Sequence, residues 1–228
     1  MRRILSLLAA LLVLEGCGGQ PEPERRAPEP GKSRSPMADD TRPVIAAFGD
    51  SLTEGFGVDP AHSYPSILQR EMDARGYPYR VVNLGVSGDT TTNGVARLST
   101  VLALKPAIVV LEFGANDGLR GLPVARARAN LETMITALAG GGATVVLAGM
   151  TLPPNYGAGY IREFERMYRE LAAKHRLALI PFLLEGVGGT EVYMQGDGLH
   201  PNAEGSAKVA QNVLKVLEPL LRSRRDAA

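Results

Sequence analysis

Five short apolar runs, separated by segments with helical periodicity, constrain the fold of this chain more than any other feature of its sequence. The runs cover residues 44–47, 79–84, 107–112, 144–148 and 177–182. Helices are predicted over residues 64–72, 93–104, 123–139, 160–175 and 202–221. Nearly continuous apolar strands that alternate with helices are typical of a parallel sheet covered on both faces. The sequence therefore predicts an α/β fold, a three-layer α/β/α sandwich with five strands.

Polar, glycine-containing loops follow the predicted strands and precede the last helix. Gly-Asp-Ser-Leu at 49–52 follows the first strand, and Gly88 lies in the loop after the second. Gly-Ala-Asn-Asp at 114–117 follows the third strand, and Asp-Gly-Leu-His at 197–200 precedes the last helix. Each of these motifs alone is common in turns. Because open α/β sheets bind ligands beyond the carboxyl ends of their strands, we expect these loops to share one rim.

The residue types on this rim are those that acyl transfer to a serine requires. Ser51 provides a hydroxyl, His200 a base for its proton, and Asp197 a carboxylate three residues away that can orient the imidazole. Hydrogen-bond donors for an oxyanion are available from the Ser51 and Gly88 backbone N–H groups and from the Asn116 side chain. The sequence thus predicts a Ser-Asp-His triad with a three-donor oxyanion hole.

These four blocks, in this order, resemble the SGNH (GDSL) hydrolase family over the whole predicted folded part of the chain. Within that family the sequence looks like the bacterial group of multifunctional acyl-CoA thioesterases, lysophospholipases and arylesterases. The resemblance implies a flavodoxin-like five-stranded parallel sheet and a serine esterase or thioesterase that needs no metal or organic cofactor. It also implies that Ser51, Asp197 and His200 are catalytic, with Ser51, Gly88 and Asn116 in the oxyanion hole.

An apolar groove for the acyl group is expected beside the catalytic loops. The residues predicted to line it are Leu119, Leu122, Leu152, Pro153 and Tyr156. Residues 152–159 are rich in glycine and proline, so this segment is either a lid over the acyl chain or a plain connector. Neither the acyl-chain length nor a preference between esters and thioesters follows from the sequence.

The N-terminal part predicts export and membrane attachment. Arg2 and Arg3 precede an apolar stretch over residues 4–14 that is too short for a membrane span but suits a signal peptide. Residues 1–17 resemble a lipoprotein signal that ends at a lipidated Cys17, on the periplasmic or cell-surface side. The alternative is a soluble periplasmic or secreted protein. Residues 18–42 are proline-rich and predict a disordered tether, residues 43–222 the hydrolase domain, and residues 223–228 a polar tail.

Composition narrows the possible partners. The net charge of +1 provides no electrostatic reason to bind nucleic acid, and the single cysteine excludes an internal disulfide framework. Structural roles are expected for His62 and His175, and helix-start and loop roles for Glu54 and Asp50. Two other functions remain open, a carbohydrate O-acetyl esterase and a non-catalytic surface-lipoprotein binding domain. The oligomeric state does not follow from the sequence.

Overall fold

A computed structural model of the chain describes residues 40–226. The predicted signal peptide, Cys17 and most of the predicted tether lie outside the described residues. The end of the predicted tether, by contrast, contacts the folded part, because Arg42 Nη1 donates a hydrogen bond to Asp73 at 3.1 Å. No helix within residues 40–226 is both long enough and apolar enough to cross a membrane.

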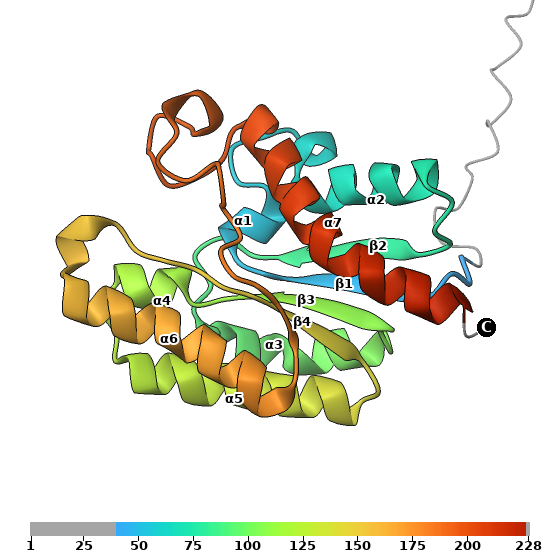
Figure 1. Cartoon of the computed structure of the whole chain (residues 1–228), viewed down its shortest axis with the longest axis horizontal. Coiled ribbons are helices and arrows are strands. Elements are labelled where there is room, and N and C mark those ends of the chain that lie inside the picture. The colour runs from blue at the N-terminus through green and yellow to red at the C-terminus, as the bar shows by residue number, and fades with distance from the viewer. Residues whose placement is uncertain (1–39, 227–228) are drawn as a thin grey trace, which may run out of the picture. The chain divides into compact units, whose positions relative to one another are not determined.

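The structure contains a five-stranded sheet in the order β2-β1-β3-β4-β5, with all neighbouring strands parallel (Figure 1). The strands are β1 Val44–Gly49, β2 Arg80–Gly85, β3 Ile108–Glu112, β4 Thr144–Ala148 and β5 Ala178–Ile180. This order is the flavodoxin-like arrangement of doubly wound folds. The predicted fold class is therefore confirmed.

Helices cover both faces of the sheet, as Figure 1 shows. On one face lie α2 (Tyr64–Ala74) and α7 (Ala203–Asp226), which pack against each other. On the other face lie α3 (Thr91–Ala103), α5 (Val124–Gly140) and α6 (Ala158–His175). The short elements are α1 Ser51–Glu54, α4 Ala115–Leu119 and the 3₁₀ turns η1 Pro60–His62, η2 Pro154–Tyr156 and η3 Glu191–Tyr193.

Burial explains why the strands show no alternation of polar and apolar residues. Every residue of β1 and β3 is buried, because helices cover both faces of these central strands. The edge strand β2 is only partly buried and tolerates Asn83. On α6 the predicted apolar face is also found, with Phe164, Tyr168 and Leu171 fully buried.

Most element ends lie within two residues of the prediction, and two of the differences have a visible physical cause. Strand β5 covers only Ala178–Ile180 instead of 177–182, and it stops directly before Pro181, which has no N–H for the ladder. Helix α7 continues past Leu221 to Asp226 with Pro219 inside it. Arg224 in its last turn donates to Thr144 Oγ1 at 2.6 Å, so this turn is attached to the start of β4.

The chain leaves β1 and β3 toward opposite faces of the sheet. After β1 it continues through α1 to α2, and after β3 it continues through α4 to α5 on the other face (Figure 1). Strands β1 and β3 are direct neighbours in the sheet. This is a topological switch point, where the diverging connections leave a crevice at the carboxyl ends of the strands. Ser51 and Asn116 begin the two diverging segments and therefore lie beside that crevice.

Candidate active site

Ser51, His200 and Asp197 form one hydrogen-bonded line across the crevice. The Ser51 Oγ lies 2.9 Å from His200 Nε2, and His200 Nδ1 lies 2.6 Å from Asp197 Oδ2. Ser51 starts α1 directly after β1, whereas the other two residues lie in the loop that leads into α7. The structure therefore brings together three residues that the sequence separates by up to 149 positions.

The charge of Asp197 determines which imidazole nitrogen carries the proton. Partial burial works to raise the pKa of Asp197, but hydrogen bonds from the His200 ring, the His200 N–H and the Leu199 N–H outweigh it and hold that pKa at about 2. An ionised carboxylate can only accept, so Nδ1 carries the hydrogen that Asp197 receives. The lone pair of Nε2 is then free to accept the hydroxyl hydrogen of Ser51.

The loop that carries His200 is fixed by contacts on both sides. Asp197 Oδ1 accepts the backbone N–H groups of Leu199 at 2.9 Å and His200 at 3.0 Å, which closes the turn that the spacing predicts. Gln195 Nε2 donates to the Phe56 carbonyl at 2.7 Å and connects this loop to the segment after α1. The Phe56 ring lies against the imidazole of His200, with centroids 4.7 Å apart. Sequence reasoning missed both Gln195 and Phe56, which have no motif of their own.

The three candidate oxyanion donors differ in what they already bind. Among the contacts within residues 40–226, the Ser51 and Gly88 N–H groups donate no hydrogen bond. Asn116 Nδ2 instead donates to Asp50 Oδ2 at 3.1 Å and to the Asp89 carbonyl at 3.0 Å. Both amide hydrogens of Asn116 are thus in use. Gly88 has a φ of +80°, a conformation in which a side chain would be strained.

Two carboxyl groups are buried directly behind Ser51. Glu112 Oε2 accepts the Asp50 N–H at 3.1 Å and the Thr53 hydroxyl at 2.9 Å, while Glu112 Oε1 is buried without a partner. Burial raises the pKa of Asp50 to about 6, although hydrogen bonds from Leu52 and Asn116 oppose the shift. Burial, followed by the charge of Asp50, raises the pKa of Glu112 well above its ordinary value. The buried site therefore favours the protonated form of Glu112 over its carboxylate.

The raised pKa of Glu112 predicts that its titration makes the folded protein less stable as pH rises, which is the opposite of the usual effect of a carboxyl group. A folded-state pKa above the unfolded value of 4.5 means that the folded protein binds the extra proton, so stability falls as pH rises above 4.5. One such proton changes the free energy of unfolding by at most about 1.4 kcal/mol per pH unit. The variant Glu112→Gln cannot lose a proton, and its melting temperature should fall less between pH 5 and about pH 8.

Thermal melting across this pH range measures the effect, and Glu163→Gln is the matched control. Glu163 lies on an exposed face of α6, so its replacement should leave the pH dependence of the wild type unchanged. Parallel melting curves for the wild type and Glu112→Gln would contradict the raised pKa of Glu112.

An apolar cavity of about 420 Å³ opens beside the Ser51–His200 pair. Three of the five residues predicted for the acyl groove line it, namely Leu119, Leu152 and Pro153. The sequence did not predict the other apolar walls. They include Leu52 and Leu199, which lie inside the catalytic motifs but carry no catalytic group, and Met150, Phe182, Leu184 and Met194, which belong to no motif.

Leu122 and Tyr156 do not line this cavity. The Tyr156 hydroxyl donates to the Leu119 carbonyl at 2.8 Å, and the Leu122 carbonyl accepts the Tyr160 hydroxyl at 2.6 Å. Both contacts join the segment after β4 to the segment around α4. Tyr156 therefore supports a cavity wall instead of forming it.

The other candidate side chains have structural contacts. His175 Nε2 lies 2.8 Å from Glu132 Oε1, and His62 ends the short turn η1. Glu54 accepts the Ser87 N–H at 2.8 Å, so it binds the loop after β2. Within residues 40–226, no group of three or more His, Cys, Asp or Glu side chains could hold a metal ion.

The structure combines a parallel α/β sheet with a serine, an imidazole and a carboxylate in line at its switch point, and an apolar cavity lies beside them. This combination defines a serine hydrolase that acts on acyl compounds. A comparison with protein families agrees, because residues 47–208 match the family described as GDSL-like Lipase/Acylhydrolase. The chain belongs to this family, and the resemblance predicted from the four sequence blocks is confirmed.

Named relatives carry the same class of activity. The chain is 47% identical to "Esterase TesA" of Pseudomonas aeruginosa over 78% of its length and 89% of the relative. It is 34% identical to "Thioesterase 1/protease 1/lysophospholipase L1" of Escherichia coli K12, over 78% of this chain and 85% of the relative. The solved structure titled "Crystal Structure of TesA" superposes with a TM-score of 0.76 at 45% identity, over 78% of this chain and 99% of that one.

Proposed function

We propose that the chain hydrolyses carboxylic esters and thioesters through an acyl-enzyme intermediate on Ser51. The Ser51 Oγ attacks the carbonyl carbon while its proton passes to His200 Nε2, and Asp197 stabilises the imidazolium that forms. Collapse of the tetrahedral intermediate breaks the bond to the leaving group, which takes the proton from His200 as an alcohol or thiol. A water molecule then repeats the sequence and releases the carboxylic acid. The 2.9 Å separation of Ser51 Oγ and His200 Nε2 carries this proposal.

The negative oxygen of the intermediate is proposed to bind the N–H groups of Ser51 and Gly88 and the amide of Asn116. For this, Asn116 has to exchange one of its present hydrogen bonds, to Asp50 or to the Asp89 carbonyl, for the oxyanion. Loss of one such donor typically costs about 2.7–4 kcal/mol of transition-state stabilisation. Because Asp50 Oδ2 already accepts the Asn116 amide, the carboxylate of Asp50 competes with the oxyanion for this donor.

A fluorophosphonate probe tests the nucleophile directly. It should label the full-length protein at one residue, and mass spectrometry of the labelled peptide should identify Ser51. A burst of p-nitrophenol, equal to one product molecule per enzyme, is expected when the protein is mixed with an excess of an aryl ester whose acyl-enzyme hydrolyses slowly. Label on another residue, or steady hydrolysis in a protein that the probe fails to inactivate, would contradict the proposed mechanism. Absence of both label and hydrolysis would favour the non-catalytic binding domain.

The apolar cavity supports substrates with a short or medium acyl chain. Its walls Leu119, Leu152 and Phe182 offer no hydrogen bonds from their side chains, so they suit an aliphatic chain better than an acetylated sugar. The substrate range is therefore proposed to include aryl esters, lysophospholipids and acyl thioesters. The test compares hydrolysis rates on p-nitrophenyl acetate, butyrate and octanoate with the release of acetate from acetylated xylan. Faster hydrolysis of the aryl esters supports this substrate range, whereas preferential release of acetate from xylan supports carbohydrate deacetylation.

Gly118→Ala is predicted to shift the preference toward shorter acyl chains. A Cβ at Gly118 would lie 2.5 Å from Leu152 Cδ2, so the flexible end of Leu152 has to move. Because Leu152 lines the cavity, this movement narrows the space for the acyl chain. The ratio of kcat/KM for octanoate to that for acetate should fall roughly 10-fold.

Gly159→Ala provides the matched control, because a Cβ there meets nothing within 4 Å. Its chain-length profile should equal that of the wild type. An unchanged ratio in Gly118→Ala would show that the acyl chain does not occupy the space beside Leu152.

We also propose that the chain is exported and anchored by lipid on Cys17. The support is sequence alone, with Arg2 and Arg3 ahead of an apolar stretch that ends at Cys17. Metabolic labelling with palmitate should mark the wild type and the Ser51→Ala variant, but not Cys17→Ala. Label that survives Cys17→Ala, or a wild type without label, would refute anchoring at this cysteine.

A further inference from the structure

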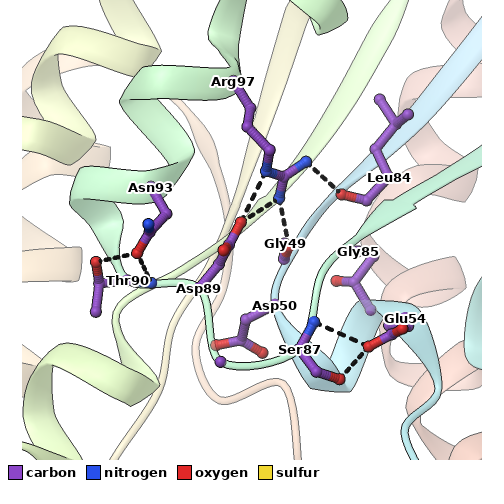
Figure 2. A network of polar contacts seen from close by, with 12 residues as sticks. Gly49, Asp50, Glu54, Leu84, Gly85, Ser87, Asp89, Thr90, Asn93 and Arg97 are labelled. Carbon is purple, nitrogen blue, oxygen red and sulfur yellow. Dashed lines mark hydrogen bonds and ion pairs between the residues drawn. The ribbon is translucent and has the colours of Figure 1, made fainter.

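The loop between β2 and α3, which carries Gly88, is attached on both sides of this glycine through a carboxylate outside the catalytic motifs, that of Glu54 at Ser87 and that of Asp89 itself (Figure 2). On one side, Glu54 of α1 accepts both the N–H and the hydroxyl of Ser87. On the other side, Arg97 of α3 binds the carboxylate of Asp89. Gly88 lies between these two attachments, and its own carbonyl accepts Arg120 Nη2 at 2.9 Å.

Arg97 contacts more than its ionic partner. Its Nε and Nη2 both lie 2.7 Å from Asp89 Oδ2. The same guanidinium donates to the Leu84 carbonyl through Nη1 and to the Gly49 carbonyl through Nη2, each at 3.2 Å. Figure 2 shows these bonds converging on one side chain from α3.

These acceptors belong to the segments that carry the oxyanion donors. Gly49 ends β1 two residues before Ser51, and Leu84 and Asp89 enclose the loop with Gly88. The carbonyl of Asp89 in turn accepts the amide of Asn116 at 3.0 Å. One guanidinium therefore connects directly to two donor segments and, through Asp89, to the third.

The surroundings of Arg97 favour a fixed geometry. Its guanidinium carbon lies 5.0 Å from the ring centroid of Phe48 and 5.9 Å from that of Phe113, and its side chain is 27% exposed. A planar group that lies near aromatic rings and donates in several fixed directions cannot be replaced by lysine without loss of contacts.

We infer that Arg97 is a positioning residue that sets the relative placement of the oxyanion donors. This inference rests on the proposed function of Gly88 and Asn116. Arg97 does not touch the substrate but acts through Asp89 and the carbonyls at the ends of β1 and β2. A distant ion pair with no such connections, such as Arg128 with Glu170 between α5 and α6, lacks this role.

The test compares Arg97→Ala with Arg128→Ala in the full chain. We expect Arg97→Ala to lower kcat on p-nitrophenyl butyrate roughly 10- to 100-fold. This loss is no larger than the loss expected when a single oxyanion donor is deleted, because the donors are displaced and not removed. KM should stay within about two-fold, since the acyl cavity is intact. Affinity for an alkyl boronic acid, whose tetrahedral adduct places an oxygen in the oxyanion hole, should fall in parallel with kcat.

Further variants separate positioning from a merely structural role. Arg97→Lys keeps the charge opposite Asp89 and should recover part of the kcat, and Arg128→Ala should match the wild type in every measurement. If Arg97→Ala does not fold, Asp89→Asn decides, because it weakens the ion pair but leaves the Asp89 carbonyl in place. It should lower kcat by roughly 5-fold or more without a change in melting temperature.

Two results would overturn the inference. One is a kcat within about two-fold of the wild type in Arg97→Ala, or in Asp89→Asn if the former is unfolded. The other is a loss of kcat without weaker binding of the boronic acid. Failure of the proposed function is distinguishable, because it would appear as ester hydrolysis that survives Ser51→Ala, whatever happens at Arg97.

Discussion

Ser51→Ala is expected to lower kcat on a short p-nitrophenyl ester by roughly 10⁶-fold, which is the typical effect of removing a serine nucleophile from an intact triad. The variant keeps the backbone N–H of Ser51, so the oxyanion donors and the apolar cavity should leave only a small residual rate above that in water. The side chain is small and borders the cavity, so its loss should not unfold the protein. Steady-state hydrolysis and a melting curve on the same preparation measure both properties.

Ser66→Ala is the matched control for this variant. Ser66 lies on α2, where its hydroxyl accepts a hydrogen bond from Ser63 at 3.0 Å, and it does not line the cavity. Its rate should equal that of the wild type. A folded Ser51→Ala protein that retains a measurable fraction of wild-type kcat would exclude Ser51 as the nucleophile.

His200→Ala should lower kcat by a similar factor, roughly 10⁶-fold, because the hydroxyl of Ser51 then has no group to receive its proton. The more informative measurement is the double variant Ser51→Ala, His200→Ala. Groups that act as one unit show non-additive losses, so the double variant should be no slower than either single variant. Each kcat on the same ester measures this directly.

His175→Ala is the corresponding control, since His175 pairs with Glu132 away from the crevice. It should retain the wild-type kcat. If the losses of the two single variants instead multiplied in the double variant, Ser51 and His200 would act in independent steps, contrary to their hydrogen bond at 2.9 Å.

Much of the fold could be predicted from the sequence, because this sheet is buried on both faces. Continuous apolar runs identified all five strands, and the helical spacing on α6 identified its buried face. The element ends were less predictable. The length of β5 depends on Pro181, whose missing N–H stops the ladder, and the reach of α7 depends on a contact between Arg224 and Thr144.

The candidate site was predictable where its residues lie in short motifs at strand ends. Its supporting contacts were not, because they depend on which side chains meet across the sheet. Glu112 looks like the ordinary end of a strand, yet it is buried beside Asp50. Arg97 looks like a residue on the solvent side of a helix, but it binds Asp89 and the backbone carbonyls of Leu84 and Gly49 at once. The hydroxyl of Tyr156 donates to the Leu119 carbonyl, and the residue does not line the cavity. The spacing of residues in the sequence does not predict the direction of such a side chain.

The distance along the chain between Ser51 and His200 has a consequence for how activity arises. Their hydrogen bond joins residues 149 positions apart, and α7, which follows His200, packs against α2 early in the chain. Contacts of such long range carry a large loop-closure cost and slow folding. A growing chain that has completed β1 to β4 already contains the serine and the Gly88 loop but no base. We therefore expect hydrolytic activity to appear only once the last quarter of the polypeptide has been synthesised and has docked.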